Sequence, residues 1–182
     1  MNVSRASCCI AAVLLGIVCG TSVLAAQAGG ANQALPGGAN SIQEAHGDWR
    51  VACSQQGGQK VCTLSQQIMD RNSRQRILAI ELNAPASDHV EGTLVLPFGL
   101  TLDKGITLQV DELAVGPTLR FRTCLPAGCV VSVRFDAKAL AALKTGTALT
   151  VKATGDNEQE IPFTISLRGF ASAIDRTAAL AK

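Results

Sequence analysis

The chain has few of the side chains on which enzyme chemistry commonly depends. Its 182 residues include two histidines, His46 and His89, so a Ser-His-acid hydrolase would have to be built around one of them. It has no Gly-x-Ser-x-Gly motif, which would mark a nucleophile. It also lacks the Cys-x-x-Cys motif of thiol exchange and a glycine-rich loop for phosphate. We therefore predict no catalytic residue, no cofactor and no bound metal.

A hydrolase with an unrecognised site is the alternative to this interpretation. The nearest polar cluster in the sequence consists of Asp88, His89 and Glu91, which a solvated loop explains equally simply. Paired carboxylates such as Asp111-Glu112 and the acidic residues Glu158 and Glu160 fall where turns or strand ends are expected. A glycosidase needs two carboxylates across a cleft, and the sequence does not single out such a pair.

A strong excess of charge of either sign is also absent. The chain has 16 basic and 14 acidic residues, and its formal net charge is +2. Proteins that bind nucleic acids by their phosphates need a concentrated basic surface. We therefore predict that nucleic acid is not a partner.

Residues 1–28 have the features of a secretory signal peptide. Arg5 supplies a positive start, "CCIAAVLLGIVCGTSVLAA" supplies the apolar stretch, and small residues follow, so we predict cleavage between Ala26 and Gly29. A membrane anchor and a lipid-modified Cys19 are the alternatives, although Val18 stands where a lipoprotein signal has Gly or Ala. No later segment approaches 18 apolar residues, so we predict an exported protein without a transmembrane span after signal removal.

Four of the seven cysteines lie beyond this segment, and they form two close pairs. They are Cys53, Cys62, Cys124 and Cys129. Their spacing within each pair is longer than in most zinc knuckles, and an oxidising compartment favours disulfides. Because each pair can close a hairpin, we predict the bridges Cys53–Cys62 and Cys124–Cys129.

Alternation of apolar and polar residues begins near His46 and predicts β-strands. If Cys53 lies opposite Cys62, then Val51 lies opposite Leu64 on the same face, so the disulfide and the apolar pattern agree. We predict a flexible Gly/Ala/Asn-rich lead-in over residues 29–45 and one domain over residues 46–182. About nine short strands with turns between them indicate a mainly β fold, either an antiparallel sandwich or a partly closed barrel.

One or two short helices complete the prediction. The first occupies residues 136–146, with Asp136 as its N-cap and Gly146 after its end. The second occupies residues 170–180.

The second cysteine pair fits its strands less simply. The apolar residues face each other if Phe121 pairs with Val133, but this register puts Cys124 opposite Val130. A "PAG" turn with a β-bulge beside it would bring the two sulfurs together. We therefore expect a local irregularity in this hairpin.

Several motifs in this order resemble the invasion-associated locus B (IalB) family of bacterial cell-envelope proteins. They are "W-x-V-x-C" from Trp49 to Cys53, "C-T-L-x-Q" from Cys62 to Gln66, "LPFGLTLDKGITLQVD" over 96–111, "F-x-T-C-x-P-x-G-C" from Phe121 to Cys129, and "LRGFASAI" over 167–174. The resemblance implies an immunoglobulin-like β-sandwich located in the periplasm or on the outer surface of a Gram-negative bacterium. For some pathogenic members it also implies a part in entering host cells. It supplies no catalytic residues.

Arginines offer the best candidate for a binding surface. Strand alternation would place Arg120, Arg122 and Arg134 on one face, opposite the apolar face of their hairpin. A second set, at residues 71, 74 and 76, falls in a predicted turn. Either set could contact an anionic glycan, lipid or protein patch, and an ordinary solvated face is the alternative. We predict an exported cell-envelope protein with an interaction or support role, whose partner is an envelope or host component.

Overall fold

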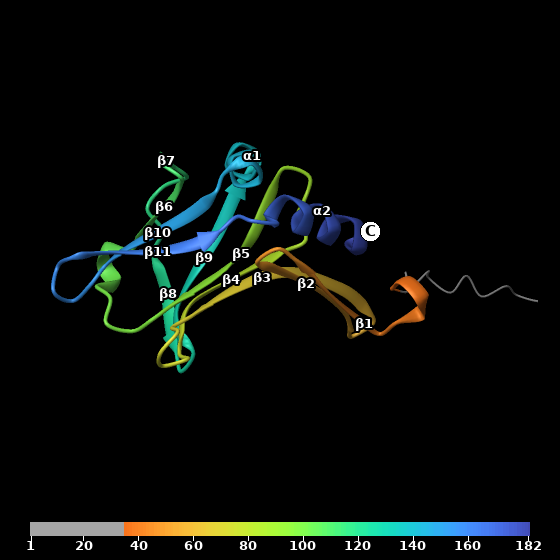
Figure 1. The fold of residues 1–182 in the computed structure, drawn as a ribbon, viewed down its shortest axis with the longest axis horizontal. Coiled ribbons are helices and arrows are strands. Elements are labelled where there is room, and N and C mark those ends of the chain that lie inside the picture. The colour runs from red at the N-terminus through yellow and green to blue at the C-terminus, as the bar shows by residue number, and fades with distance from the viewer. Residues whose placement is uncertain (1–34) are drawn as a thin grey trace, which may run out of the picture. The chain divides into compact units, whose positions relative to one another are not determined.

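The fold consists of two antiparallel β-sheets with two α-helices beside them, seen in a computed structural model that describes residues 35–182 (Figure 1). The predicted signal peptide and the first part of the predicted lead-in lie outside the described residues. The large sheet has the strand order β1-β2-β3-β4-β5-β9-β8 and the small sheet the order β11-β10-β6-β7. The prediction of an antiparallel sandwich is confirmed, and residues 35–182 contain eleven strands rather than about nine.

The strands of the large sheet are β1 (Ser41–His46), β2 (Trp49–Gln56), β3 (Gln59–Met69), β4 (Arg76–Asn83), β5 (His89–Leu96), β8 (Phe121–Leu125) and β9 (Gly128–Asp136). Those of the small sheet are β6 (Ile106–Val110), β7 (Leu113–Ala114), β10 (Ala148–Thr154) and β11 (Glu160–Ser166). The helices are α1 (Ala137–Thr145), α2 (Phe170–Ala181) and two short 3-10 turns, η1 (Pro36–Gly38) and η2 (Leu102–Lys104).

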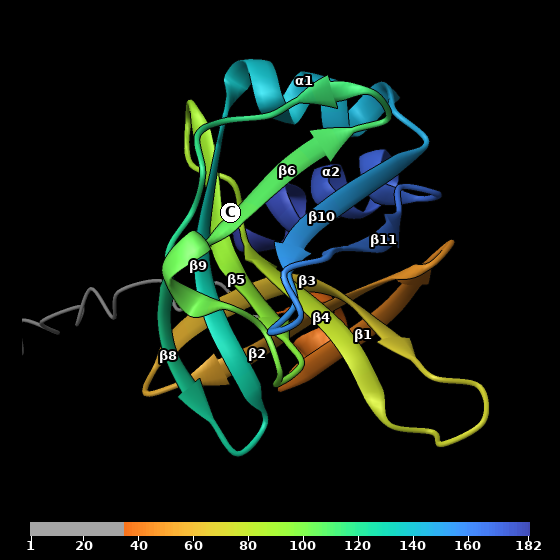
Figure 2. The same ribbon diagram turned by 90° about the vertical axis from the view of Figure 1, so that its left-hand side faces the viewer.

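The two sheets bury a single apolar core between them. Val51, Leu64 and Leu94 of the large sheet are 0% exposed, as are Val151 and Ile165 of the small sheet. Helix α2 contacts β1, β2 and β3, and therefore covers a part of the large sheet that the small sheet leaves open (Figures 1 and 2). Helix α1 begins as predicted, because the Asp136 carboxylate accepts a hydrogen bond of 2.7 Å from the Ala139 amide.

Two buried polar side chains join the sheets at the end of β11. The indole nitrogen of Trp49 and the amide nitrogen of Gln66 each donate to the Ser166 carbonyl oxygen at 2.9 Å. The Gln66 side-chain oxygen in turn accepts from the Ser166 amide at 3.0 Å. Gln66 can therefore lie among inward-facing apolar residues because backbone groups satisfy its side chain.

The start of the domain differs from the prediction. The lead-in was expected to run to residue 45, but residues 41–46 form β1 and Leu35 is only 1% exposed. The sequence pattern does not reveal this strand, because only one of its three half-buried positions, Ile42, is apolar. The other two are Glu44 and His46. Glu44 and His46 face the polar side of α2 rather than the apolar core, so their burial does not require apolar side chains.

Both disulfides form as predicted, each within a hairpin. In the first, Cys53 pairs with Cys62 and Val51 with Leu64, as the apolar pattern required. In the second, the register shifts between Phe121 and Thr123, so that Phe121 pairs with Val131 rather than with Val133.

The irregularity expected in the second hairpin is therefore present, and it lies at Arg122. It lets Cys124 pair directly with Cys129 while the apolar face of the hairpin is kept. Two residues, Pro126 and Ala127, connect the strands.

Candidate functional site

The structure pairs Arg134, one of the three predicted surface arginines, with an acidic neighbour. Arg134 lies on β9 opposite Glu91 of β5, and its guanidinium nitrogen is 2.5 Å from a Glu91 carboxylate oxygen. His89 extends the contact, with Nε2 3.5 Å from Glu91 and Nδ1 2.6 Å from Asp88. The sequence placed these acidic residues and the histidine in a loop, but only Asp88 precedes the strand, and His89 and Glu91 belong to β5. Together they form a surface chain of polar contacts in which Glu91 offsets the charge of Arg134.

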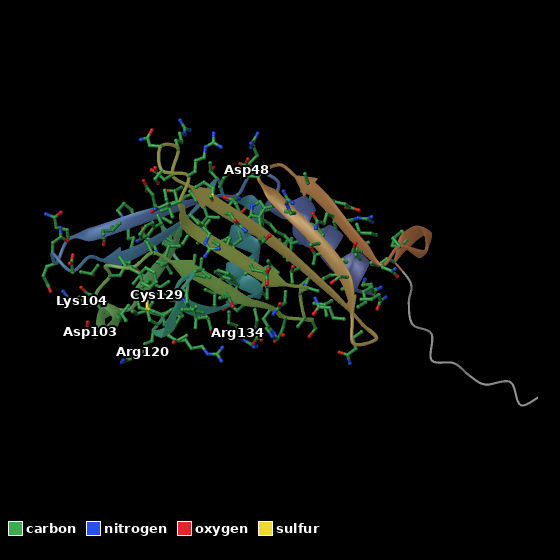
Figure 3. All side chains as sticks on the ribbon, turned by 90° about the horizontal axis from the view of Figure 1, so that it is seen from below. Asp48, Asp103, Lys104, Arg120, Cys129 and Arg134 are labelled. Carbon is green, nitrogen blue, oxygen red and sulfur yellow. A yellow bond between two sulfur atoms is a disulfide. The ribbon has the colours of Figure 1, made fainter. Side chains whose placement is uncertain are left out.

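Arg120 and Arg122 are in a different situation. Arg120 precedes β8, Arg122 is the extra residue at the bulge, and both are exposed. Among residues 35–182, neither forms an ion pair with an acidic side chain. Figure 3 shows Arg120 near Cys129, with Arg134 farther along the same sheet. Because the bulge interrupts the alternation from which a shared face was inferred, a common anionic site for all three arginines stays a prediction.

The outer face of the large sheet carries several open hollows. One of about 500 Å³ is lined by Glu81 and Asn83 of β4, Glu91 and Thr93 of β5, and Arg134 of β9, among others. Glu81 also borders hollows of about 390 Å³ and 300 Å³. The two carboxylates, Glu81 and Glu91, project from one face of one sheet, whereas a glycosidase holds its substrate between two carboxylates. The hollows offer hydrogen-bonding groups more readily than paired acid-base chemistry.

A serine, a histidine and a glutamate meet between β1 and α2, which the sequence did not predict. His46 Nδ1 lies 3.2 Å from Ser172 Oγ, and His46 Nε2 lies 3.3 Å from a Glu44 carboxylate oxygen. These residue types resemble those of a Ser-His-acid hydrolase. The hydrogen bonds around them decide whether the serine is activated.

The serine and the glutamate, at the two ends of this chain of contacts, both form hydrogen bonds with other groups. The Ser172 hydroxyl donates to the Gly169 carbonyl oxygen at 2.9 Å, so its proton is directed away from His46. Arg176 binds both oxygens of Glu44, at distances from 2.7 to 3.1 Å. This hydrogen bond from Arg176 is the main cause that lowers the pKa of Glu44 to about 2, which makes it a weak base for orienting a histidine.

The same contacts form a clasp of three rungs between the first hairpin and the C-terminal segment. Asp48 pairs with Arg168, His46 with Ser172, and Glu44 with Arg176. Glu44 and His46 are alternate residues of β1, and their partners Ser172 and Arg176 are four apart on α2, so the two spacings are about equal. Asp48 and Arg168 continue the series just outside the two elements. The Arg168 hydrogen bond likewise lowers the pKa of Asp48 to about 2.

A close backbone approach completes the clasp. Gly47 and Gly169 both have positive φ, and a side chain on Gly169 would collide with the His46 carbonyl oxygen. The clasp therefore has the character of a structural joint. Its charges could have been noticed in the sequence, since two acidic residues at 44 and 48 match two arginines eight positions apart at 168 and 176.

Two further properties bear on function. Within residues 35–182, no three His, Cys, Asp or Glu side chains gather as metal ligands. None of the helices in that range combines the length and the apolar character needed to cross a membrane.

Comparison with known proteins places this fold in a family. Residues 49–178 match the family described as "Invasion associated locus B (IalB) protein". The chain belongs to the IalB family. The match spans both disulfide hairpins, the small sheet and most of α2.

IalB relatives and a solved structure agree with this assignment. The chain is 46% identical over 149 residues to an invasion protein B homologue of Brucella abortus, covering 81% of this chain and 86% of that protein. It is 36% identical over 152 residues to invasion protein B of Bartonella bacilliformis, covering 81% of each. The crystal structure of invasion associated protein B from Bartonella henselae matches with a TM-score of 0.72 and 34% identity, over 76% of this chain and 96% of that one.

Proposed function

We propose that this IalB protein is exported to the periplasm or outer surface of a Gram-negative bacterium, where it acts by surface contact and contributes to host-cell association or entry. Membership of the IalB family carries the proposal, because the relatives are named invasion proteins. Two disulfide-closed hairpins fit an oxidising compartment outside the cytoplasm. The partner is an envelope or host protein, or an anionic glycan or lipid.

The surface chemistry supports contact rather than catalysis. The outer face of the large sheet offers open hollows lined by both polar and apolar side chains, which suit recognition of a partner. The serine-histidine-glutamate group is bound into the clasp by Gly169 and Arg176. A hydrolase is the second candidate because that group contains the necessary residue types.

A gene-deletion experiment tests the proposed role. Bacteria lacking the gene should enter cultured host cells less often than the parent strain, and a plasmid copy should restore entry. Resistance to detergent should be measured in parallel, because a general loss of envelope integrity would also lower entry. Unchanged entry after deletion would refute the host-cell role, and entry lost together with detergent resistance would indicate envelope support instead.

A further inference from the structure

Three exposed apolar side chains lie at one end of the large sheet. Met69 ends β3 and is 49% exposed, Phe98 follows β5 and is 61% exposed, and Leu125 ends β8 and is 53% exposed. Large apolar side chains exposed together, rather than singly, mark interaction surfaces.

Printed contacts connect the three segments that carry these side chains. Met69 pairs with Arg76, and the Arg76 guanidinium donates to the Ala127 carbonyl oxygen in the β8–β9 turn at 2.6 Å. Leu96, two residues before Phe98, pairs with Cys129 of the same hairpin. The loop after β3 and the β8–β9 hairpin both lie at the lower left of Figure 1; in Figure 2 the hairpin points downward and the loop reaches the lower right.

Arginines stand beside these apolar side chains. Arg71 and Arg74 lie on the loop after β3, Arg122 lies on β8, and among residues 35–182 none of them forms an ion pair. The loop is ordered around Asp70, whose carboxylate accepts from the amides of Asn72 and Ser73 at 3.0 and 2.7 Å. Asp70 is therefore occupied by its own loop, while the arginines are left exposed. The neighbouring β10–β11 turn carries two acidic residues: Asp156, whose amide donates to the Gly99 carbonyl oxygen at 3.2 Å, and Glu158, which is paired with Lys104.

We infer that this apolar-basic end, formed by Met69, Phe98, Leu125, Arg71, Arg74 and Arg122, docks on a membrane surface that contains anionic phospholipid. Apolar side chains on projecting loops can enter the boundary between headgroups and acyl chains, and each arginine near an anionic surface adds attraction. The three exposed apolar side chains belong to separate segments, and none of them lines the hollows of the outer face, which favours insertion into a soft surface over reception of a protein side chain. The inference rests on the proposed function, since it specifies the anionic lipid among the proposed partners.

Vesicle co-sedimentation of the exported protein tests this inference. The vesicles contain either phosphatidylcholine alone or phosphatidylcholine with about one third phosphatidylglycerol. Wild-type protein should bind the anionic vesicles, and high salt should weaken this binding because salt screens exposed charge. Replacing Met69, Phe98 and Leu125 together by Ser should weaken binding at least tenfold. The R71Q/R74Q variant should weaken binding to anionic vesicles several-fold and lose most of the salt dependence.

Matched controls separate a surface effect from a folding effect. Leu113 of β7, on the small sheet, is 71% exposed, so L113S removes an apolar side chain elsewhere that is more exposed than any of the three. K138Q removes an exposed basic side chain of α1, which follows the opposite end of β9. Both controls should bind like the wild type, and all variants should have unchanged far-UV circular dichroism.

Absence of wild-type binding to anionic vesicles would overturn the inference. Equal binding by the triple serine variant, or an equal loss in L113S, would overturn it too. Host cells are not present in this measurement, so its failure leaves the proposed role in host-cell entry intact. Conversely, normal entry after gene deletion would refute that role without altering the vesicle result.

Discussion

Replacement of Trp49 should be the most destabilising single change in the first hairpin. Its side chain is 2% exposed, its ring packs edge-on against Phe170 with centroids 5.0 Å apart, and its indole nitrogen donates to Ser166. Truncating a buried tryptophan to alanine costs about 3 to 5 kcal/mol in the free energy of unfolding. W49A should fall in this range, because the ring belongs to the buried core and packs against Phe170.

W49F separates packing from hydrogen bonding at the same position. It keeps an aromatic ring beside Phe170 and loses one hydrogen bond, which is worth about 1 kcal/mol. The Ser166 carbonyl still accepts from Gln66, so no buried acceptor is left without a donor. We expect W49F to cost roughly half as much as W49A, that is about 2 kcal/mol.

Urea unfolding followed by circular dichroism measures both variants. Fluorescence is unsuitable because Trp49 is the only tryptophan. V61A, at a position that is 37% exposed, is the control and should change stability by less than about 0.5 kcal/mol. A W49A variant that is as stable as V61A would show that Trp49 does not hold β2 against α2.

Three further predictions concern the clasp and the hairpins. The pKa of Glu44 is lowered from 4.5 to about 2, so its contribution to the free energy of unfolding should be complete above about pH 5 and lost as the pH falls through 2. E44Q should therefore flatten the measured pH dependence of unfolding over this range. An unchanged profile would argue against the Arg176 contact. G169A should lower stability by more than about 1 kcal/mol, because Gly169 has positive φ and lies against the His46 carbonyl, and a melting temperature equal to that of the parent would contradict this. Non-reducing peptide mapping should link Cys53 to Cys62 and Cys124 to Cys129. Each bridge should contribute roughly 2 to 3 kcal/mol to the free energy of unfolding, from the chain entropy that it removes from the unfolded state. A crosslink between the two hairpins would refute the pairing.

The sequence was sufficient for most of the sandwich because its strands alternate clearly. Val51, Leu64 and the first cysteine pair lie on one face, and only one register satisfies all of them. Asp136 likewise identified the start of α1, because its carboxylate accepts a hydrogen bond from a backbone amide in the first turn of the helix.

The clasp escaped prediction because its contacts join distant parts of the chain. Glu44 was assigned to the lead-in and His46 to the edge of the domain, and their contacts with α2 become visible only in the folded chain. Strand alternation likewise predicted that three arginines share one face. The bulge at Arg122 could not be predicted because it depends on the register of β8 against β9, and the Glu91 partner of Arg134 could not be predicted because it lies on the neighbouring strand β5. The apolar-basic end is formed by three segments that are separate in the sequence, so no local pattern of residues predicts it.

The distinction between contact and catalysis can be tested with the serine-histidine group itself. Host-cell entry should be measured for the deletion strain carrying the wild-type gene, S172A, or a control S87A in an exposed loop. Each protein should be present at equal amounts in the envelope. The proposed function predicts that S172A restores entry as fully as the wild type and S87A, because the Ser172 hydroxyl serves only the clasp. Entry abolished by S172A, with the protein folded and exported normally, would contradict the account and favour a hydrolase.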